Sequence, residues 1–307
     1  MAQIREIKKR MVAVRTIQRI TKTMQMIATA KFTAALQRAK ATRPYTERIR
    51  ELVAEVSAAA GDVDNPLLGV RSGGSGKSAG KEILLVVTSD RGLCGAYNGS
   101  VLRNAMNEIR KRRAAKCEVI VETAGKKGVA FFRFQKMDIA ERHSFGDKPV
   151  FADVAALADR YMADFVAGKI DAVHVAYMRF ISASRQVPEV MQLLPLTVEA
   201  SVAASASAAT AATAATAAKG AATVYDFRPS AEVLLNDLLP KSVKVSLFQA
   251  LNDSVVSENV MRMVAMKAAT DNASGLGRTL KRNFNRARQA KITTELTEII
   301  SGAAALE

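Results

Sequence analysis

The chain has 307 residues, of which 49% are apolar, a composition that suffices for a buried core and excludes an intrinsically disordered tail protein. Lysine and arginine number 45 against 29 acidic residues, so the formal net charge at pH 7 is +16. A surplus of this size points to an acidic partner, either nucleic acid, anionic lipid or an acidic protein surface.

The positive charge is concentrated at the two ends of the chain. Residues 1–60 carry 13 basic and 4 acidic side chains, and residues 241–291 carry 10 and 3. Residues 61–240 are balanced at 22 to 19 and hold 12 of the 16 Phe and Tyr residues. Because aromatic side chains anchor compact cores, we expect a globular middle domain over residues 61–240 and ends of a different kind.

The sequence also argues against a metal site, a disulfide framework and a membrane span. Cys94 and Cys117 are too few for a disulfide framework, and with only His143 and His174 beside them no zinc-ligand spacing occurs. No apolar run approaches the roughly 18 residues of a membrane span, and the N-terminus lacks the apolar segment of a signal peptide. We expect a soluble chain in a reducing compartment, without metal or cofactor.

The first segment predicts a long helix over about residues 3–57. Its apolar residues recur in steps of three and four, which places them along one seam: Ile4, Ile7, Met11, Val14, Ile17, Ile20, Met24 and Ile27. Pro44 predicts a kink in this helix, and the turn residues after position 60 end it.

The middle segment predicts an α/β domain. Apolar runs at 82–89, 117–123, 171–180 and 187–196 are typical of buried strands, and helices are expected at 99–113, 125–134 and 150–168. This alternation favours a parallel or mixed sheet with helices on its faces. Two stretches predict flexible segments by composition: 71–80, rich in Gly and Ser, and 200–223, with 14 Ala among 24 residues. For 200–223 the alternative to a solvated loop is a marginal helix.

After Pro240 a second long helix is expected over about 241–301, with Pro240 either delaying its start or bending it. The apolar stripe runs through Val243, Leu247, Leu251, Val255, Met261, Val264, Ala268, Leu276, Leu280, Phe284 and Ala287. At 1.5 Å per residue the two terminal helices would be roughly 80 and 90 Å long, against about 50 Å for a globule of this size. Each apolar seam needs a packing partner, and an antiparallel coiled coil of the two helices provides one for both. A bundle of shorter helices is the alternative.

The middle domain shows no catalytic set. The string GGSGKS (73–78) resembles the end of a phosphate-binding loop, but Arg71 stands where the first glycine is required, and a strand follows where a helix is needed. Cys94 has no sequence partner for nucleophilic chemistry, and His174 lies within an apolar run typical of a packed core. We therefore expect a chain without an active site of its own.

Five segments together resemble the gamma subunit of F-type ATP synthases. They are IKKRMVAVRTIQRITKTMQMIATAKF (7–32), TSDRGLCG (88–95), MRMVAMKAATDN (261–272), NRARQA (285–290) and ITTELTEIISGAA (292–304). The resemblance runs in order over essentially the full length and is weakest at 61–80 and 200–223.

The resemblance implies a fold and a role. It implies an α/β protein in which the N-terminal (1–60) and C-terminal (241–307) shaft helices form a long antiparallel coiled coil beside a central Rossmann-like domain. It further implies a rotor inside a ring of alpha and beta subunits, with the middle domain against the epsilon subunit and the c-subunit ring. Ion flow would turn the c ring and this shaft, and ATP would be made on the partners. The chain would lie peripherally on the cytoplasmic face of a bacterial membrane, touching it only through partners.

The resemblance also carries over contact residues for the beta subunits. The upper-shaft contact maps onto Arg288, Gln289 and Thr293, for which the alternative is an ordinary solvated face. Met24 matches a lower contact, with core packing as its alternative. Lys9, Arg10 and Lys22 are candidates on charge alone, and for each of them the alternative is again a solvated face.

Two further expectations follow. The paired cysteines of the plastid members are missing, so we predict no thiol regulation. Nucleic-acid binding is the rival class, because the basic N-terminal helix could serve as an electrostatic footprint for DNA; the rotor interpretation requires no nucleic acid.

Overall fold

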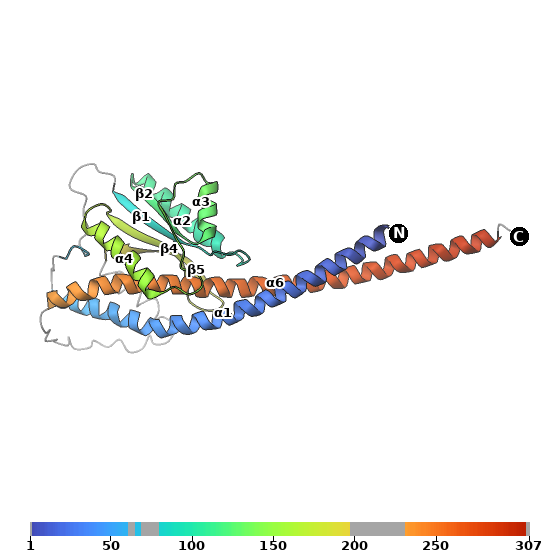
Figure 1. Cartoon of the computed structure of the whole chain (residues 1–307), viewed down its shortest axis with the longest axis horizontal. Coiled ribbons are helices and arrows are strands. Elements are labelled where there is room, and N and C mark those ends of the chain that lie inside the picture. The colour runs from blue at the N-terminus through green and yellow to red at the C-terminus, as the bar shows by residue number, and fades with distance from the viewer. Residues whose placement is uncertain (1, 61–64, 69–79, 197–230, 305–307) are drawn as a thin grey trace, which may run out of the picture. The chain divides into compact units, whose positions relative to one another are not determined.

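The computed structural model describes residues 2–60, 65–68, 80–196 and 231–304 (Figure 1). The chain divides into two compact units, one formed by Met1–Lys31 with Val260–Glu307 and the other by Phe32–Asn259. We call these the paired-helix unit and the sheet unit. Helices α1 (Ala2–Ala60) and α6 (Ala231–Ala304) contribute to both. The expected flexible stretches, 71–80 and 200–223, lie outside the described residues except for Gly80.

Helix α6 begins ten residues before the position expected from Pro240, which lies inside it. Proline removes one helical hydrogen bond, at a cost of about 3 kcal/mol. Leu235 and Leu239, on the N-terminal side of Pro240, are both fully buried, and each gains about 2 kcal/mol from burial. The apolar stripe therefore continues across the proline, and the expected start at 241 is wrong. Pro44 likewise lies inside α1, which extends close to the predicted 3–57.

In the paired-helix unit, most of the buried and half-buried residues of α1 follow a heptad in alternating steps of four and three. The residues of this heptad are Ile4, Ile7, Met11, Val14, Gln18, Thr21, Gln25 and Ala28, and Met24 and Lys31 are half-buried beside it. The prediction that Ile17, Ile20 and Ile27 share this seam is wrong, because each of the three is 52% exposed. A strict heptad has a period of 3.5 residues, which means alternating steps of four and three. Counted from Val14, these steps lead to the polar positions 18, 21 and 25.

Helix α6 presents a matching heptad to α1. The positions of this heptad, all buried or half-buried, are Met266, Thr270, Ala273, Gly277, Leu280, Phe284, Ala287 and Lys291, and further residues beside them are also covered. Leu280, Phe284 and Ala287 were predicted for this stripe, whereas Val264, Ala268 and Leu276 were misplaced and are exposed. Small residues occupy half of the α6 seam, at Thr270, Ala273, Gly277 and Ala287, and they let the two helix backbones approach closely there.

Two contacts establish that the helices of this unit run antiparallel. The hydroxyl oxygens of Thr21 and Thr270 lie 2.8 Å apart. The side chain of Val14 lies 3.9 Å from the position that a Cβ on Gly277 would take. A step of seven residues forward in α1 is thus a step of seven residues backward in α6. The predicted antiparallel coiled coil is confirmed.

The sheet unit contains a five-stranded sheet in the order β3-β2-β1-β4-β5. The strands are β1 (Lys81–Val87), β2 (Glu118–Ala124), β3 (Glu141–His143), β4 (Ala172–Phe180) and β5 (Gln186–Leu194). Strands β1 to β4 are parallel to one another, and β5 is antiparallel to β4. The four predicted strands are confirmed, but β3 was missed because its three residues, ERH, carry no apolar pattern.

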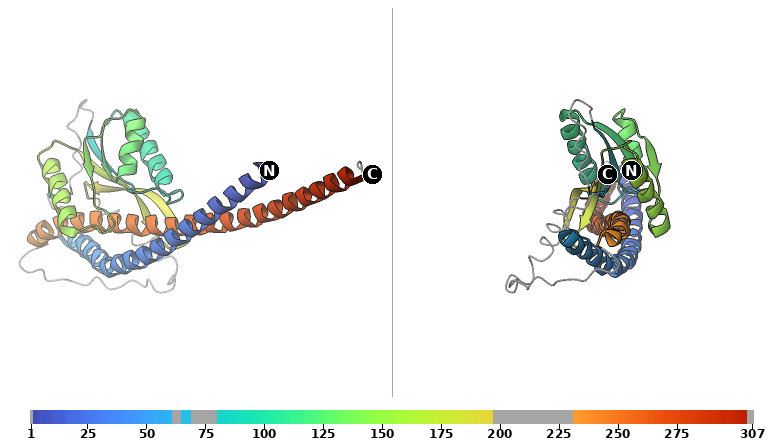
Figure 2. Two further views of the ribbon diagram at one scale, coloured as in Figure 1. Left: turned by 45° about the vertical axis from the view of Figure 1, so that its right-hand side comes forward. Right: turned by 90° about the vertical axis from the view of Figure 1, so that its left-hand side faces the viewer.

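Helices cover both faces of this sheet (Figure 2). Helix α4 (Phe151–Val166), with parts of α1 and α6, packs on the face to which Ile83, Leu85 and Val87 contribute. Helices α2 (Tyr97–Ala114) and α3 (Lys126–Phe134) lie on the other face. The core of this unit therefore consists of two apolar layers, one on each side of the sheet. No described helix of the chain is long and apolar enough to span a membrane.

Candidate functional site

The contact residues expected on α6 are exposed in the paired-helix unit. Arg288, Gln289 and Thr293 all lie at the surface, near the C-terminal end of the helix. The Thr293 hydroxyl donates to the Gln289 carbonyl oxygen at 3.0 Å, as expected for residues four apart on one helix face. The structure thus places Gln289 and Thr293 side by side, with Arg288 adjacent.

The candidate residues on α1 do not form a single cluster. Lys9, Arg10 and Lys22 are exposed, but Arg10 and Lys22 are separated by about 18 Å along the helix axis at 1.5 Å per residue. The Arg10 guanidinium lies 2.5 Å from the Glu6 carboxylate in a solvent-exposed ion pair. Met24 is half-buried beside the seam, so part of its surface already packs within this chain.

The paired-helix unit also exposes large apolar side chains that sequence reasoning assigned to the seam or did not single out. Each of the following is more than half exposed: Val12, Ile17, Ile20, Met26, Ile27, Val264, Leu276, Ile292, Leu296, Ile299 and Ile300. The same two segments carry 16 basic and 5 acidic residues. Apolar exposure on this scale marks an interaction surface. One feature of the sequence could have predicted this surface: the two segments contain more isoleucines than one heptad seam can hold.

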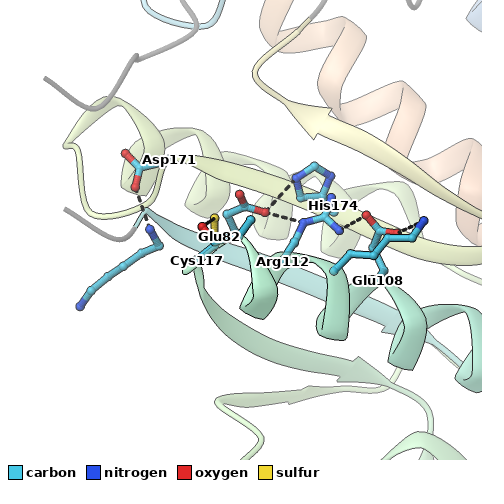
Figure 3. A network of polar contacts seen from close by, with 9 residues as sticks. Glu82, Glu108, Arg112, Cys117, Asp171 and His174 are labelled. Atoms are coloured by element: carbon cyan, nitrogen blue, oxygen red, sulfur yellow. Dashed lines mark hydrogen bonds and ion pairs between the residues drawn. The ribbon is translucent and has the colours of Figure 1, made fainter. Parts of the chain in front are cut away.

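In the sheet unit, Glu82 is the centre of a half-buried polar network between β1, α2 and β4 (Figure 3). Its carboxylate accepts from Arg112 Nε at 2.5 Å and lies 3.3 Å from His174 Nε2, while Arg112 also binds Glu108. Burial, reinforced by the nearby Arg112 charge, lowers the pKa of His174 to about 3. His174 is therefore neutral and packed, as predicted, and the network fastens α2 to the sheet.

The two cysteines lie in different environments. Burial, and then the negative charge of Glu82, raises the pKa of the Cys117 thiol, so the inert protonated form predominates. Cys94 is 2% exposed, and its sulfur accepts from Asn98 Nδ2 at 3.1 Å.

A second network joins β2, β3 and α4 around Glu122. One of its carboxylate oxygens lies 2.8 Å from His143 Nε2, 2.6 Å from Arg160 Nη2 and 2.8 Å from the Tyr161 hydroxyl. Burial raises the pKa of Glu122, but hydrogen bonds from His143 and Tyr161 and the Arg160 charge outweigh it, so the pKa lies below its usual value. Glu122 is consequently ionised, and His143 donates from Nε2.

The residues Glu122, Glu141 and His143 offer ligand atoms within 4.8 Å of one another, which is close enough for a metal ion. The Arg160 guanidinium binds both carboxylates, however. It thereby supplies the positive charge that a bound cation would provide. The four residues of this cluster come from β2, β3 and α4, so no local sequence motif predicts it.

The loop that follows β1 holds the first turn of α3. Asp90 accepts a hydrogen bond from the Lys126 amide at 3.1 Å, the Ser89 carbonyl accepts from Lys127, and the Thr88 hydroxyl accepts from the Gly128 amide at 2.8 Å. These three acceptors satisfy the orphan N–H groups of a helix N-terminus. The segment TSD (88–90) thus has a structural role in positioning α3.

Comparison with known proteins identifies the family. A family model described as ATP synthase matches residues 3–306. The ATP synthase gamma chain of Rhodopirellula baltica is 41% identical over 308 residues, and that of Heliobacterium modesticaldum 39% over 307, each with full coverage of both chains.

Solved structures share the fold. A chain of the Euglena gracilis mitochondrial ATP synthase, in a structure of OSCP, F1 and c-ring, gives a TM-score of 0.63 at 17% identity, covering 99% of this chain and 95% of that one. A chain of the Tetrahymena thermophila mitochondrial ATP synthase central stalk and c-ring gives 0.55 at 23%, covering 81% and 99%. With full-length curated relatives at this identity and a family model over nearly every residue, the chain belongs to the ATP synthase gamma chain family.

Proposed function

We propose that this chain is the central rotor shaft of an F-type ATP synthase. In this role the paired-helix unit turns inside the ring of alpha and beta subunits and transmits rotation of the membrane c ring to the catalytic sites. The chain itself supplies torque and no chemistry. Membership of the gamma chain family supports the role as a central-stalk subunit. The coupling of c-ring rotation to the catalytic sites is our inference.

The observation that carries the proposal is the surface of the paired-helix unit. The heptad seams of its two helices already pack against each other. Ile17, Ile20 and Ile27 nevertheless face outward on a surface that also carries many cations. Such a surface is unfavourable in water unless a partner encloses it. Exposed ion pairs contribute only about 0–1 kcal/mol each, so a ring can hold this surface and still release it at each step.

The remaining partners follow from the same role. We place the epsilon subunit and the c ring against the sheet unit, and the whole assembly on the cytoplasmic face of a bacterial membrane. The relatives of known structure come from an F1/c-ring complex and a central stalk with c-ring, which supports contact with the c ring. Contact with the membrane itself is through the partners.

We propose that Arg288, Gln289 and Thr293 contact the beta subunits near the tip of the shaft. Their exposure on one stretch of α6 supports this assignment. Lys9, Arg10 and Lys22 are proposed as charge contacts lower on the shaft. The half-burial of Met24 leaves only part of its side chain for a beta contact.

Purification of the native assembly at moderate salt tests the proposal. Alpha and beta subunits should co-purify at three copies each per copy of this chain. Their absence, together with steeply salt-dependent binding of duplex DNA, would refute the rotor role and favour nucleic-acid binding.

The tip contact has its own test. Arg288→Ala should lower the ATPase activity of the assembled complex that is coupled to ion pumping. Arg286→Ala removes an exposed cation two residues away, on a different side of the same helix, and serves as the matched control. Equal activity of the two variants would count against the contact at Arg288.

A further inference from the structure

The outer surface of α2 and α3 in the sheet unit is strongly basic. Residues 97–136 contain ten basic and three acidic residues, although residues 61–240 as a whole are balanced. Of the acids, Glu122 is buried, Glu108 binds Arg112 and Lys111, and Glu118 lies 3.7 Å from Lys81. Nine of the cations are exposed: Arg103, Arg110, Lys111, Arg113, Lys116, Lys126, Lys127, Arg133 and Lys136. We call this surface the basic α2–α3 face.

A large aromatic side chain projects from this face. Phe134, the last residue of α3, is 83% exposed, whereas Phe132 of the same helix is fully buried. Exposing a phenylalanine to this degree forgoes about 2 kcal/mol of burial energy. Arg133 precedes Phe134, and Lys127 lies two turns away on the same side of the helix, so the aromatic ring stands among cations.

Both helices end with a lysine where glycine is usual. Lys116 follows α2 with φ +64°, and Lys136 follows α3 with φ +54°. In each case the next amide reaches back to the helix: Cys117 to the Arg112 carbonyl, and Met137 to the Phe132 carbonyl, both at 3.0 Å. This is the helix-ending motif in which a left-handed residue favours glycine. The chain therefore keeps a charge on this face at some cost in stability.

Helix α3 is held firmly to the sheet unit. The TSD loop binds its first turn, and a Cβ on Gly128 would lie 2.9 Å from the Thr88 hydroxyl, so the helix packs tightly on the end of β1. At its other end, Phe132 is inserted in the core. Phe134 is thus presented from a rigid support, and docking onto it costs little conformational entropy.

We infer that the basic α2–α3 face docks an acidic segment of another polypeptide chain, with the Phe134 ring in an apolar pocket of that partner. Protein–protein interfaces commonly place an aromatic anchor at the centre and polar, solvent-accessible groups at the rim. Surface helices that bind membranes insert an extended apolar face, whereas Phe134 is the single large apolar residue of α2 and α3 that is more than half exposed. The inference rests on the proposed place of the chain in a multisubunit assembly.

Photo-crosslinking in the native assembly tests this inference. The full-length chain carries p-benzoylphenylalanine in place of Phe134, and crosslinked peptides are identified by mass spectrometry. We expect one partner peptide rich in Asp and Glu. Val166, 47% exposed at the end of α4 and without a basic residue in its last turn, receives the same probe as the control and should not reach that peptide.

Charge variants separate docking from folding. Lys127→Glu with Arg133→Glu should lower the crosslink yield about tenfold, which corresponds to the loss of two favourable pairs and their replacement by repulsion. Lys116→Gly with Lys136→Gly should raise the thermal unfolding midpoint, because glycine suits the left-handed backbone, and should lower the crosslink yield. If these lysines had only a structural role, a rise in the unfolding midpoint would not be accompanied by a fall in the crosslink yield.

Three results would overturn the inference: crosslinks only to lipid or nucleic acid, no crosslink at position 134, or a yield unaffected by the charge variants. The proposed function fails by a different result, namely wild-type chain that purifies without alpha and beta subunits. Retention of those subunits with no crosslink at position 134 refutes the docking surface alone.

Discussion

The hydroxyl oxygens of Thr21 and Thr270 lie 2.8 Å apart, although the two residues are separated by 249 positions in the sequence. Within the sheet unit, Thr42 Oγ1 lies 3.2 Å from Gln249 Oε1. Each of these residues is 21 positions from its counterpart in the first pair, in opposite directions along α1 and α6. Both pairs thus share one antiparallel register, and at both points the residues in contact are polar.

This register predicts a specific crosslink. Replacing both Thr21 and Thr270 by cysteine should give a disulfide under mild oxidation, because their side-chain oxygens are already within contact distance. Ile20→Cys with Thr270→Cys is the matched control, since Ile20 is 52% exposed and points away from the seam. Non-reducing electrophoresis of the full chain after cleavage between the two helices distinguishes the variants. Equal crosslinking of the two pairs would contradict the register.

The close approach of the helices predicts a second effect. Ala28 is 1% exposed in the seam, so Ala28→Ile should overpack it and destabilise the pairing by about 1–3 kcal/mol. Ala30→Ile makes the same change at an exposed position of α1 and should cost less than about 0.5 kcal/mol. Hydrogen exchange of the amides around residues 21–31 reports local opening of this unit. Similar protection in the two variants would show that position 28 is not tightly packed.

Periodicity predicted the two long helices but misassigned part of their seam. A period of 3.6 and a period of 3.5 cannot be distinguished over two turns, and hydropathy favoured Ile17 and Ile20 over Gln18 and Thr21. The start of α6 was misplaced for a related reason: Pro240 is a strong local signal, but fully buried leucines on its N-terminal side outweigh it. Local rules fail where tertiary packing supplies the larger free energy.

The candidate surfaces were predictable to different degrees. The resemblance named Arg288 and its neighbours, and the structure adds their exposure. The basic α2–α3 face was missed because the charge was counted over the whole middle segment. Basic and acidic residues are balanced over 61–240, whereas basic residues predominate over 97–136. The Glu122 network could not be predicted from the sequence, because His143 and Arg160 approach Glu122 only once β3 pairs with β2 and α4 packs on the sheet.

Gly125, between β2 and α3, supports a prediction about the turn that positions α3. Its φ is +102°, and a Cβ there would lie 2.1 Å from the Thr88 carbonyl oxygen. Gly125→Ala should therefore destabilise the sheet unit by more than about 3 kcal/mol, combining backbone strain with a clash against backbone. Gly99→Ala, in α2 with open space around the new Cβ, should change stability by no more than about 1 kcal/mol and in the favourable direction. Thermal unfolding of both variants provides the measurement, and a Gly125→Ala protein as stable as the wild type would contradict the clash with Thr88.

Asp253 on α6 predicts an unusual dependence of stability on pH. Burial raises the pKa of its carboxyl to about 6, although Gln249 donates to it at 2.8 Å and two arginines oppose the shift. The folded state therefore holds the proton more tightly than the unfolded chain, whose aspartate titrates near 3.8. The free energy of unfolding contributed by this group must fall as pH rises from about 4 to about 6, by up to about 3 kcal/mol.

Asp253→Asn isolates this contribution, because the amide keeps the shape of the side chain and cannot ionise. The free energy of unfolding of the wild type minus that of Asp253→Asn should decrease between pH 4 and pH 6 and be constant above pH 7. Chemical denaturation at each pH gives the difference. Asp237→Asn, at an exposed carboxylate of the same helix paired with Lys241 at 2.6 Å, is the control and should shift stability by less than about 1 kcal/mol. A pH-independent difference for Asp253→Asn would mean that water reaches the carboxyl and that its desolvation is smaller than its position in the fold implies.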